Sequence, residues 1–152
     1  MLLYLLRHAI AQERAESDAA RELTAEGIAQ ARSVAQKFSN YSPLMERVIC
    51  SPYVRAQQTA SYLMPEFPDL ELVSDERLRP EGDIYAVLDS IEAYALEHLL
   101  LVGHNPFMSR ILSLLVDGPI ESHHYVGNAH LYCVSMDVVA PGCGEILYTL
   151  KP

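Results

Sequence analysis

Apolar residues gather in four short runs along the chain, and polar or turn-forming residues bound each run. Runs of this length are typical of strands that are buried on both faces of a sheet. We therefore predict strands at residues 2–6, 47–51, 70–74 and 99–103. Farther on, residues 130–138 and 145–150 alternate in polarity around "APGCG", which predicts a β-hairpin.

Between the strands, apolar residues recur at the spacing of amphipathic helices, and a polar residue that can cap a helix precedes each stretch. The predicted N-caps are Thr24, Ser51, Asp83 and Asn105. The first helix is expected to end at Ser39. Pro52 takes the first position of the second helix, which we expect to run to about Met64. Residues 12–23 and 77–83 lack periodicity and predict loops.

The alternation of strands and helices predicts a largely parallel sheet with helices on both faces. The expected fold class is α/β: a three-layer α/β/α sandwich with a mostly parallel central sheet and a C-terminal antiparallel hairpin. The length of 152 residues suits one domain with one substantial core. We therefore treat residues 1–152 as a single domain.

Composition argues against several classes of protein. The formal net charge of −9 is unlike that of a nucleic-acid-binding domain, which needs a basic face, and it opposes attachment to anionic lipid. No apolar segment approaches the length of a membrane span. Cys50, Cys133 and Cys143 are odd in number and match no zinc motif, which indicates free thiols and a reduced, cytoplasmic compartment.

Arginine and histidine residues follow three of the predicted strands. Arg7 and His8 end the first apolar run, Arg55 lies about one turn into the helix after the second, and His104 follows the fourth. Each residue alone is better explained by a surface or structural role. In a sheet of this class, however, ligands bind at the carboxyl ends of the strands, so the four residues together favour an anion-binding site.

The motifs that carry these residues resemble those of the histidine phosphatase superfamily, which includes the cofactor-independent phosphoglycerate mutases. They are "RHA" at 7–9, "SPYVRAQQTA" at 51–60 and "GHNP" at 103–106. The short chain, "LTAEG" at 23–27 and "RPEGD" at 79–83 are most similar to the SixA-type phosphohistidine phosphatases. The resemblance implies a phosphoglycerate mutase-like fold and a phosphatase without a cofactor.

By the same resemblance, His8 corresponds to the nucleophile, and Arg7, Arg55 and His104 correspond to the rest of the phosphate pocket. We expect the two guanidiniums to hold the phosphoryl oxygens while neutral His8 attacks phosphorus. A protonated His104 is expected to stabilise the charge that develops. Because these groups supply positive charge themselves, we expect no metal site.

Four further residues are weaker candidates for the site. Arg21 could reach the pocket from its loop, although a surface role is equally consistent, and Asn105 directly follows the second histidine. Glu81 and Asp83 fall in the region where larger relatives carry a general acid. Asp83 is, however, equally suited to capping a helix.

The weakness of this acid region bears on the substrate, because an alkoxide needs a proton to leave whereas an imidazole can leave a phosphohistidine as a neutral ring. We predict a metal-independent phosphohistidine phosphatase that acts on a phosphorylated protein, with a histidine phosphotransfer domain of a signalling relay as a candidate partner. The alternatives are a small-molecule phosphomonoesterase or mutase of the same superfamily and a non-catalytic phosphate-binding module. His123 and His124 are expected to be loop histidines at the pocket rim.

Overall fold

The computed structural model describes residues 1–41, 44–118 and 124–152. Within these ranges a six-stranded sheet has the order β3-β2-β4-β1-β5-β6. The strands are β1 (Leu2–Arg7), β2 (Arg47–Cys50), β3 (Leu72–Ser74), β4 (His98–Gly103), β5 (Leu131–Ser135) and β6 (Glu145–Leu150). The first four run parallel, and β5 and β6 form an antiparallel hairpin beside β1. The predicted sheet and hairpin are confirmed.

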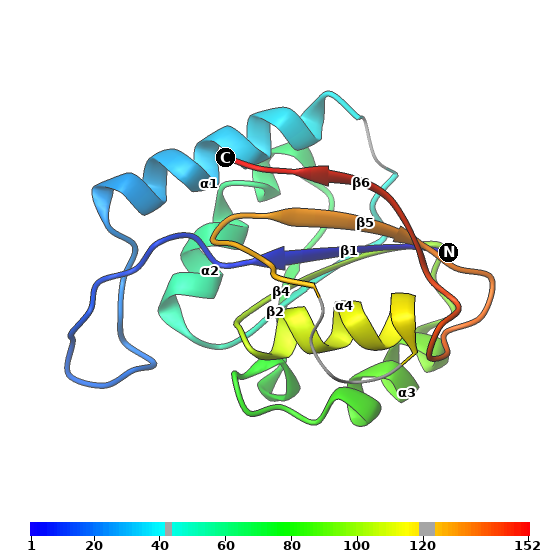
Figure 1. Cartoon of the computed structure of the whole chain (residues 1–152). Coiled ribbons are helices and arrows are strands. Elements are labelled where there is room, and N and C mark those ends of the chain that lie inside the picture. The colour runs from blue at the N-terminus through cyan, green and yellow to red at the C-terminus, as the bar shows by residue number, and fades with distance from the viewer. Residues whose placement is uncertain (42–43, 119–123) are drawn as a thin grey trace.

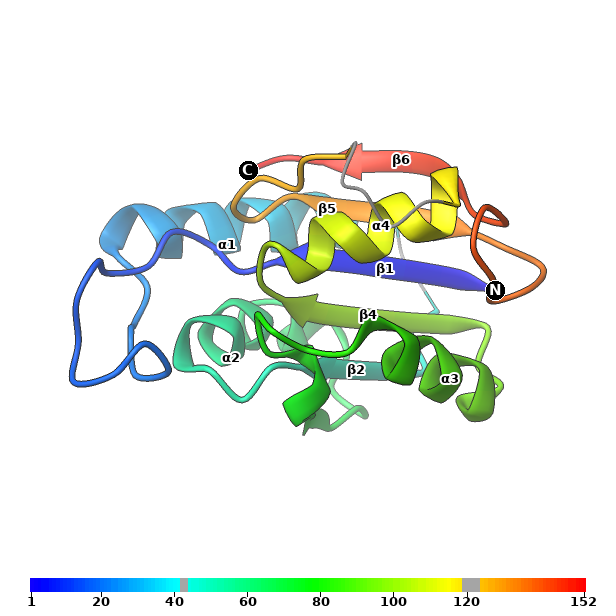
Figure 2. The same ribbon diagram turned by 60° about the horizontal axis from the view of Figure 1, so that its bottom comes forward.

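Helices cover both faces of this sheet, as Figures 1 and 2 show. The helices α1 (Ala25–Ser39) and α2 (Val54–Ser61) pack on one face, and α3 (Ile84–Tyr94) and α4 (Phe107–Asp117) pack on the other. Two 3₁₀ helices, η1 (Met64–Glu66) and η2 (Glu76–Leu78), lie in connections. The layers form the expected α/β/α sandwich. No helix within the described ranges is long and apolar enough to cross a membrane.

The central strand β1 contributes to two separate cores because its side chains alternate between the faces of the sheet. Tyr4 and Leu6 belong to the core beneath α1 and α2, and Leu3 and Leu5 belong to the core beneath α3 and α4. All four are almost completely buried. Burial of each leucine side chain stabilises the fold by roughly 1.5–3 kcal/mol.

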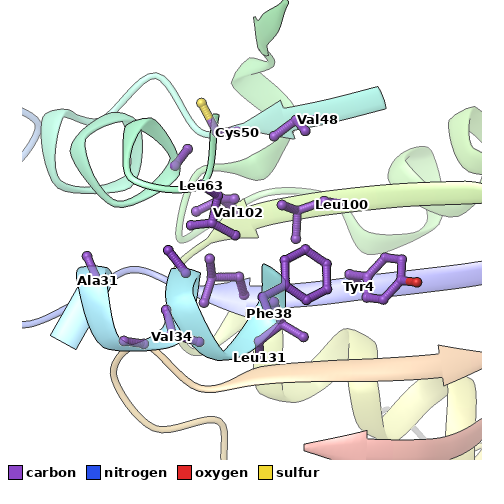
Figure 3. Packing of buried hydrophobic residues seen from close by; sticks show 14 of the residues in the cluster. Tyr4, Ala31, Val34, Phe38, Val48, Cys50, Leu63, Leu100, Val102 and Leu131 are labelled. Carbon is purple, nitrogen blue, oxygen red and sulfur yellow. The ribbon is translucent and has the colours of Figure 1, made fainter. Parts of the chain in front are cut away.

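Aromatic packing holds α1 against the middle of the sheet (Figure 3). The ring of Phe38, near the end of α1, meets the ring of Tyr4 edge to face, with 5.1 Å between the ring centroids. Leu100 and Val102 of the neighbouring strand β4 lie in the same core. The chain leaves β1 at the carboxyl edge of the sheet, and α1 then packs back over β1 and β4.

Two of the predicted N-caps are confirmed. The Thr24 hydroxyl accepts the backbone N–H of Gly27 at 3.0 Å, and the Asp83 carboxylate accepts the N–H of Tyr85 at 2.9 Å. These contacts satisfy backbone donors that the first helical turn leaves without partners. The beginnings of α1 and α3 are therefore determined by local sequence.

The second helix starts two residues later than predicted, at Val54 instead of Pro52. Ser51 was expected to cap it, but α2 begins at Val54 with Tyr53 in the cap position. The Ser51 hydroxyl instead lies 2.7 Å from Nε2 of His104. The Ser51 side chain thus contacts a residue far away in the chain instead of capping the helix that follows it.

Three other boundaries also differ. The helix α2 ends at Ser61, and η1 follows where the prediction continued the helix to Met64. The strand β3 covers only the last three residues of the run at 70–74. The segment 77–83, predicted as a loop, begins inside η2. Tertiary packing commonly shifts such ends because propensity sets them only weakly.

The helix α4 begins at Phe107, and Pro106 rather than Asn105 occupies its cap position. The Asn105 side-chain oxygen nevertheless accepts the backbone N–H of Ser109 at 3.3 Å. Asn105 therefore satisfies a backbone donor of the first turn, although it lies one position before the observed cap residue. Its amide nitrogen donates to the Val126 carbonyl at 2.8 Å, which ties the turn after β4 to the segment before β5.

Gly27 marks a close approach between α1 and the chain that follows β1. A Cβ atom added at this position would lie 1.9 Å from the carbonyl oxygen of Ile10, which is far inside contact distance. That same carbonyl accepts the backbone N–H of Thr24 at 3.0 Å. The glycine in "LTAEG" is thus required by the packing of the helix against the backbone two residues after His8.

Gly27→Ala tests this reading through the sign of its effect on stability. Helix propensity alone predicts that alanine would stabilise the protein by about 0.5–1 kcal/mol. The clash with the Ile10 carbonyl instead predicts a loss of roughly 1–3 kcal/mol, as is typical of overpacking. The measurement is the free energy of unfolding in urea. A gain in stability would contradict the close approach.

Candidate active site

A cavity of about 280 Å³ opens at the carboxyl edge of the parallel strands. The described residues that line it come from the ends of β1 and β4, the start of α2, the loop between β1 and α1, and the segment before β5. They are Arg7, His8, Ile10, Ala11, Arg21, Arg55, His104, Asn105 and Asn128. The structure therefore brings together the six cationic, histidine and asparagine candidates that the sequence singled out for phosphate chemistry.

His8 is held by backbone contacts directly after β1. Its own N–H donates to the Gly103 carbonyl at 2.9 Å, and its carbonyl accepts the side-chain amide of Asn128 at 3.1 Å. The ring atom Nδ1 lies 2.7 Å from the Ala9 carbonyl, which can only accept. This contact assigns the proton to Nδ1, so Nε2 carries the lone pair.

The surroundings of His8 favour the neutral ring. Burial lowers the pKa of His8 from 6.5 to about 4, and the guanidiniums of Arg55, Arg7 and Arg21 act in the same direction against the hydrogen bond to the Ala9 carbonyl. A neutral imidazole with an available Nε2 lone pair is the form in which histidine acts as a nucleophile.

Arg55 directs all three of its guanidinium nitrogens to protein atoms. Its Nε donates to Nε2 of His8 at 3.2 Å. Nη1 donates to the backbone carbonyl of Asp18 at 2.6 Å, and Nη2 donates to the carboxylate of Asp18 at 3.0 Å. One N–H remains on each Nη nitrogen. Arg55 lies in the first turn of α2 rather than one turn into it, because the helix starts late.

Arg7 and Arg21 add positive charge at the other sides of the cavity. Nη1 of Arg7 donates to the Val126 carbonyl at 3.1 Å, while its buried Nε has no partner among the described residues. Nη1 of Arg21 donates to the Asp18 carboxylate at 2.8 Å, and its Nε donates to the Gln12 carbonyl. Arg21 thus reaches the pocket from its loop, which is one of the two roles considered for it.

His104 lies close to His8, with 5.0 Å between the ring centroids, and is almost fully buried. Burial, the ring of His8 and the guanidinium of Arg55 lower the pKa of His104 from 6.5 to about 2. These effects favour the neutral ring, whereas the sequence led us to expect a protonated His104 at the reacting phosphoryl group. Ser51 fixes Nε2 of the ring, and Nδ1 has no partner among the described residues, so a neutral N–H is what His104 can offer.

The two acid candidates lie outside the lining of this cavity. Glu81 and Asp83 are exposed on the loop before α3, and Asp83 is engaged in capping that helix. His124 lies 3.2 Å from the Asp117 carboxylate and does not line the cavity either, whereas His123 falls outside the described residues. None of the lining residues that the structure describes is a carboxylate.

Four residues of the site were not identified from the sequence. Asp18 contacts two of the arginines, Asn128 holds the His8 carbonyl, and Ser51 contacts His104. The Thr59 hydroxyl accepts the N–H of the residue after His8 at 3.0 Å. Ser51 and Thr59 lie within the motif at 51–60, but the motif did not assign these contacts to them. The three-residue spacing of Asp18 and Arg21 signalled an ion pair, which is common on protein surfaces.

Comparisons with known proteins agree with this geometry. Residues 3–81 match the family model of the histidine phosphatase superfamily (branch 1). The chain is 32% identical over 127 residues to the phosphohistidine phosphatase SixA homolog of Haemophilus influenzae, which covers 76% of this chain and 77% of that one. It is 29% identical to phosphohistidine phosphatase SixA of Escherichia coli over 78% of this chain and 76% of the relative.

Among solved structures, the chain is similar to the protein histidine phosphatase SixA complexed with tungstate. The TM-score is 0.89 at 25% sequence identity, and the match covers 100% of this chain and 97% of the other. Similarity over almost the whole of both chains agrees with the α/β/α sandwich described above.

The lowered histidine pKa values lead to a prediction about pH. The ring C–H resonances of His8, assigned by their loss in His8→Asn, should stay at their neutral positions between about pH 7 and pH 5. The unfolded chain takes up protons as the pH falls through about 6.5, whereas folded His8 does so only at about 4. The free energy of unfolding should therefore decrease as the pH falls from about 6.5 to about 4. A titration midpoint at or above 6.5 would contradict the assignment.

Proposed function

The chain belongs to the histidine phosphatase superfamily, and from that membership we propose that it is a phosphohistidine phosphatase in which His8 is the nucleophile. The observation that carries this proposal is the placement of Nε2 of His8. It bears a lone pair, faces a cavity that three arginines line, and belongs to a ring whose other nitrogen is bound to a backbone carbonyl.

The proposed reaction has two steps. In the first, the Nε2 lone pair of His8 forms a bond to phosphorus, the substrate P–N bond breaks, and its electron pair returns to the substrate imidazole. In the second, a water oxygen attacks phosphorus and the bond to His8 breaks, with its electron pair returning to Nε2. Inorganic phosphate leaves, and the proton that water releases passes to phosphate or solvent.

Arg55 prepares the first step through its hydrogen bond to Nε2 of His8. Its Nε–H lies on the lone pair that must attack, so it orients the ring before the reaction. When phosphate enters, this N–H exchanges His8 for a phosphoryl oxygen and releases the lone pair. Arg7, whose Nε has no described partner, supplies further donors, and His104 supplies a neutral N–H.

The choice of substrate rests on the leaving group and on the relatives. The described lining of the cavity contains no carboxylate to protonate an alkoxide, and burial lowers the pKa of His104, which disfavours the protonated ring that an acid would need. An imidazole whose other nitrogen is protonated leaves as a neutral ring. The SixA relatives named above are phosphohistidine phosphatases. We take the substrate to be a phosphohistidine on a protein, with a histidine phosphotransfer domain of a cytoplasmic signalling relay as its partner.

Phosphate release from a matched panel of substrates tests this function. The panel pairs a phosphohistidine-bearing phosphotransfer domain with a serine-phosphorylated protein and a small sugar phosphate. We expect turnover of the first without added metal and little of the other two. His8→Ala should show none, and the acid-labile phosphate trapped on the wild-type protein should be absent from the variant. Retained labelling of His8→Ala, or preferential hydrolysis of the sugar phosphate, would contradict the proposal.

Arg55→Lys tests whether charge or geometry matters at the second arginine. Lysine keeps the charge but has no Nε–H to place on His8 while also reaching Asp18. We expect kcat to fall about a hundredfold, the effect of losing roughly 2–3 kcal/mol of transition-state stabilisation. Arg110→Lys, at an exposed position on α4, is the matched control. A rate for Arg55→Lys close to that of this control would show that charge alone suffices.

A further inference from the structure

Asp18 joins two of the three arginines of the cavity through a single side chain. One carboxylate oxygen accepts Nη2 of Arg55 at 3.0 Å, and the other accepts Nη1 of Arg21 at 2.8 Å. Its backbone carbonyl accepts Nη1 of Arg55 at 2.6 Å. Asp18 is therefore the partner of both terminal nitrogens of Arg55, which leaves Nε as the nitrogen that faces His8.

The backbone of the loop keeps Asp18 in this position. The carbonyl of Ala19 accepts the N–H of Val54, the first residue of α2, at 3.0 Å. At the base of the loop, the N–H of Gln12 donates to the carbonyl of Glu22 at 2.8 Å. Figure 1 shows this segment projecting beyond the carboxyl end of β1. The loop is thus attached both to itself and to the helix that carries Arg55.

The charges of the cluster suit a phosphoryl dianion. His8 and His104 are neutral, so the three guanidiniums of the cavity and the one carboxylate of Asp18 leave a net charge of two positive. Hydrogen bonds from Arg21 and Arg55 hold the pKa of the Asp18 carboxyl below its usual range, so this group is ionised at neutral pH. A buried guanidinium such as that of Arg55 needs a partner of this kind.

From this arrangement we infer that Asp18 is a positioning residue for the phosphoryl transfer that we propose for His8. It holds the Arg55 guanidinium in the orientation that places its Nε–H on the nucleophile, and it holds Arg21 at the cavity wall. Asp18 does not line the cavity, so it acts through the arginines and not on the substrate. The expected effect of Asp18 on kcat rests on the proposed function. Its effect on the orientation of the Arg55 guanidinium does not.

Removing the Asp18 carboxylate should affect phosphate binding and kcat in opposite directions. Asp18→Asn makes the cavity more positive, which strengthens the attraction for phosphate, but it lets the Arg55 guanidinium turn away from His8. We expect kcat to fall about tenfold to a hundredfold, while inorganic phosphate binds at least as tightly as to the wild type in calorimetric titration. Asp18→Ala should reduce kcat further, because asparagine still offers one oxygen to an arginine.

Glu16→Gln is the matched control. Glu16 is exposed on the same loop, makes no hydrogen bond or ion pair with any described residue, and loses the same unit of charge on substitution. We expect this variant to keep the wild-type kcat and phosphate affinity. If Asp18→Asn behaved like Glu16→Gln, or if kcat and phosphate affinity fell together, the positioning role would be refuted.

A measurement that does not depend on turnover separates this inference from the proposed function. In the wild-type protein the Arg55 Nε–H should give a sharp, slowly exchanging NMR signal, because it is buried and hydrogen-bonded. The signal should broaden or vanish in Asp18→Asn and persist in Glu16→Gln. If the wild type hydrolysed no member of the substrate panel, the proposed function would fail while this result still decided the role of Asp18. An unchanged Arg55 signal in Asp18→Asn would refute that role.

Discussion

Arg55 carries a full positive charge into the interior, where only 3% of its surface reaches solvent, and the site is arranged around the need to compensate that charge. Its terminal nitrogens meet Asp18 and its Nε meets an uncharged His8. A protonated His8 beside the same guanidinium would add like charge in a poorly solvated place, which is costly. The buried charge of Arg55 therefore favours the neutral form of the His8 ring.

The same constraint explains how an acidic protein can contain a positively charged cavity. The chain carries a net charge of −9, yet Arg7, Arg21 and Arg55 converge on one cavity, and among the described residues the carboxylate of Asp18 pairs with two of them. Burial strengthens this local field because fewer water molecules screen it. It also keeps both histidines neutral, so the positive charge belongs to arginines, which do not lose it near neutral pH.

The position of the cavity follows from the parallel pairing of β1 with β4 and of β4 with β2. The registry places Arg7 opposite Gly103, so His8 and His104 leave adjacent strands at the same level. The end of β2 lies next to them, which allows the Ser51 hydroxyl to reach His104. These three strands pair directly, and apolar residues on both of their faces are buried in the two cores. The packing of the cores therefore fixes the relative positions of the polar groups at the strand ends.

Much of this protein was determined by local sequence: the apolar strands, the helices capped by Thr24 and Asp83, and the appearance of arginine and histidine at successive strand ends. These features depend on periodicity and on contacts within a few residues, which a sequence displays directly. Only the tertiary structure decided that Ser51 contacts a histidine instead of capping α2, that burial lowers the pKa of His104, and that Asp18 joins two arginines. Those outcomes depend on burial and on partners that are distant in the chain. The spacing of residues in the sequence reveals neither the loss of solvent around a charge nor a long-range hydrogen bond.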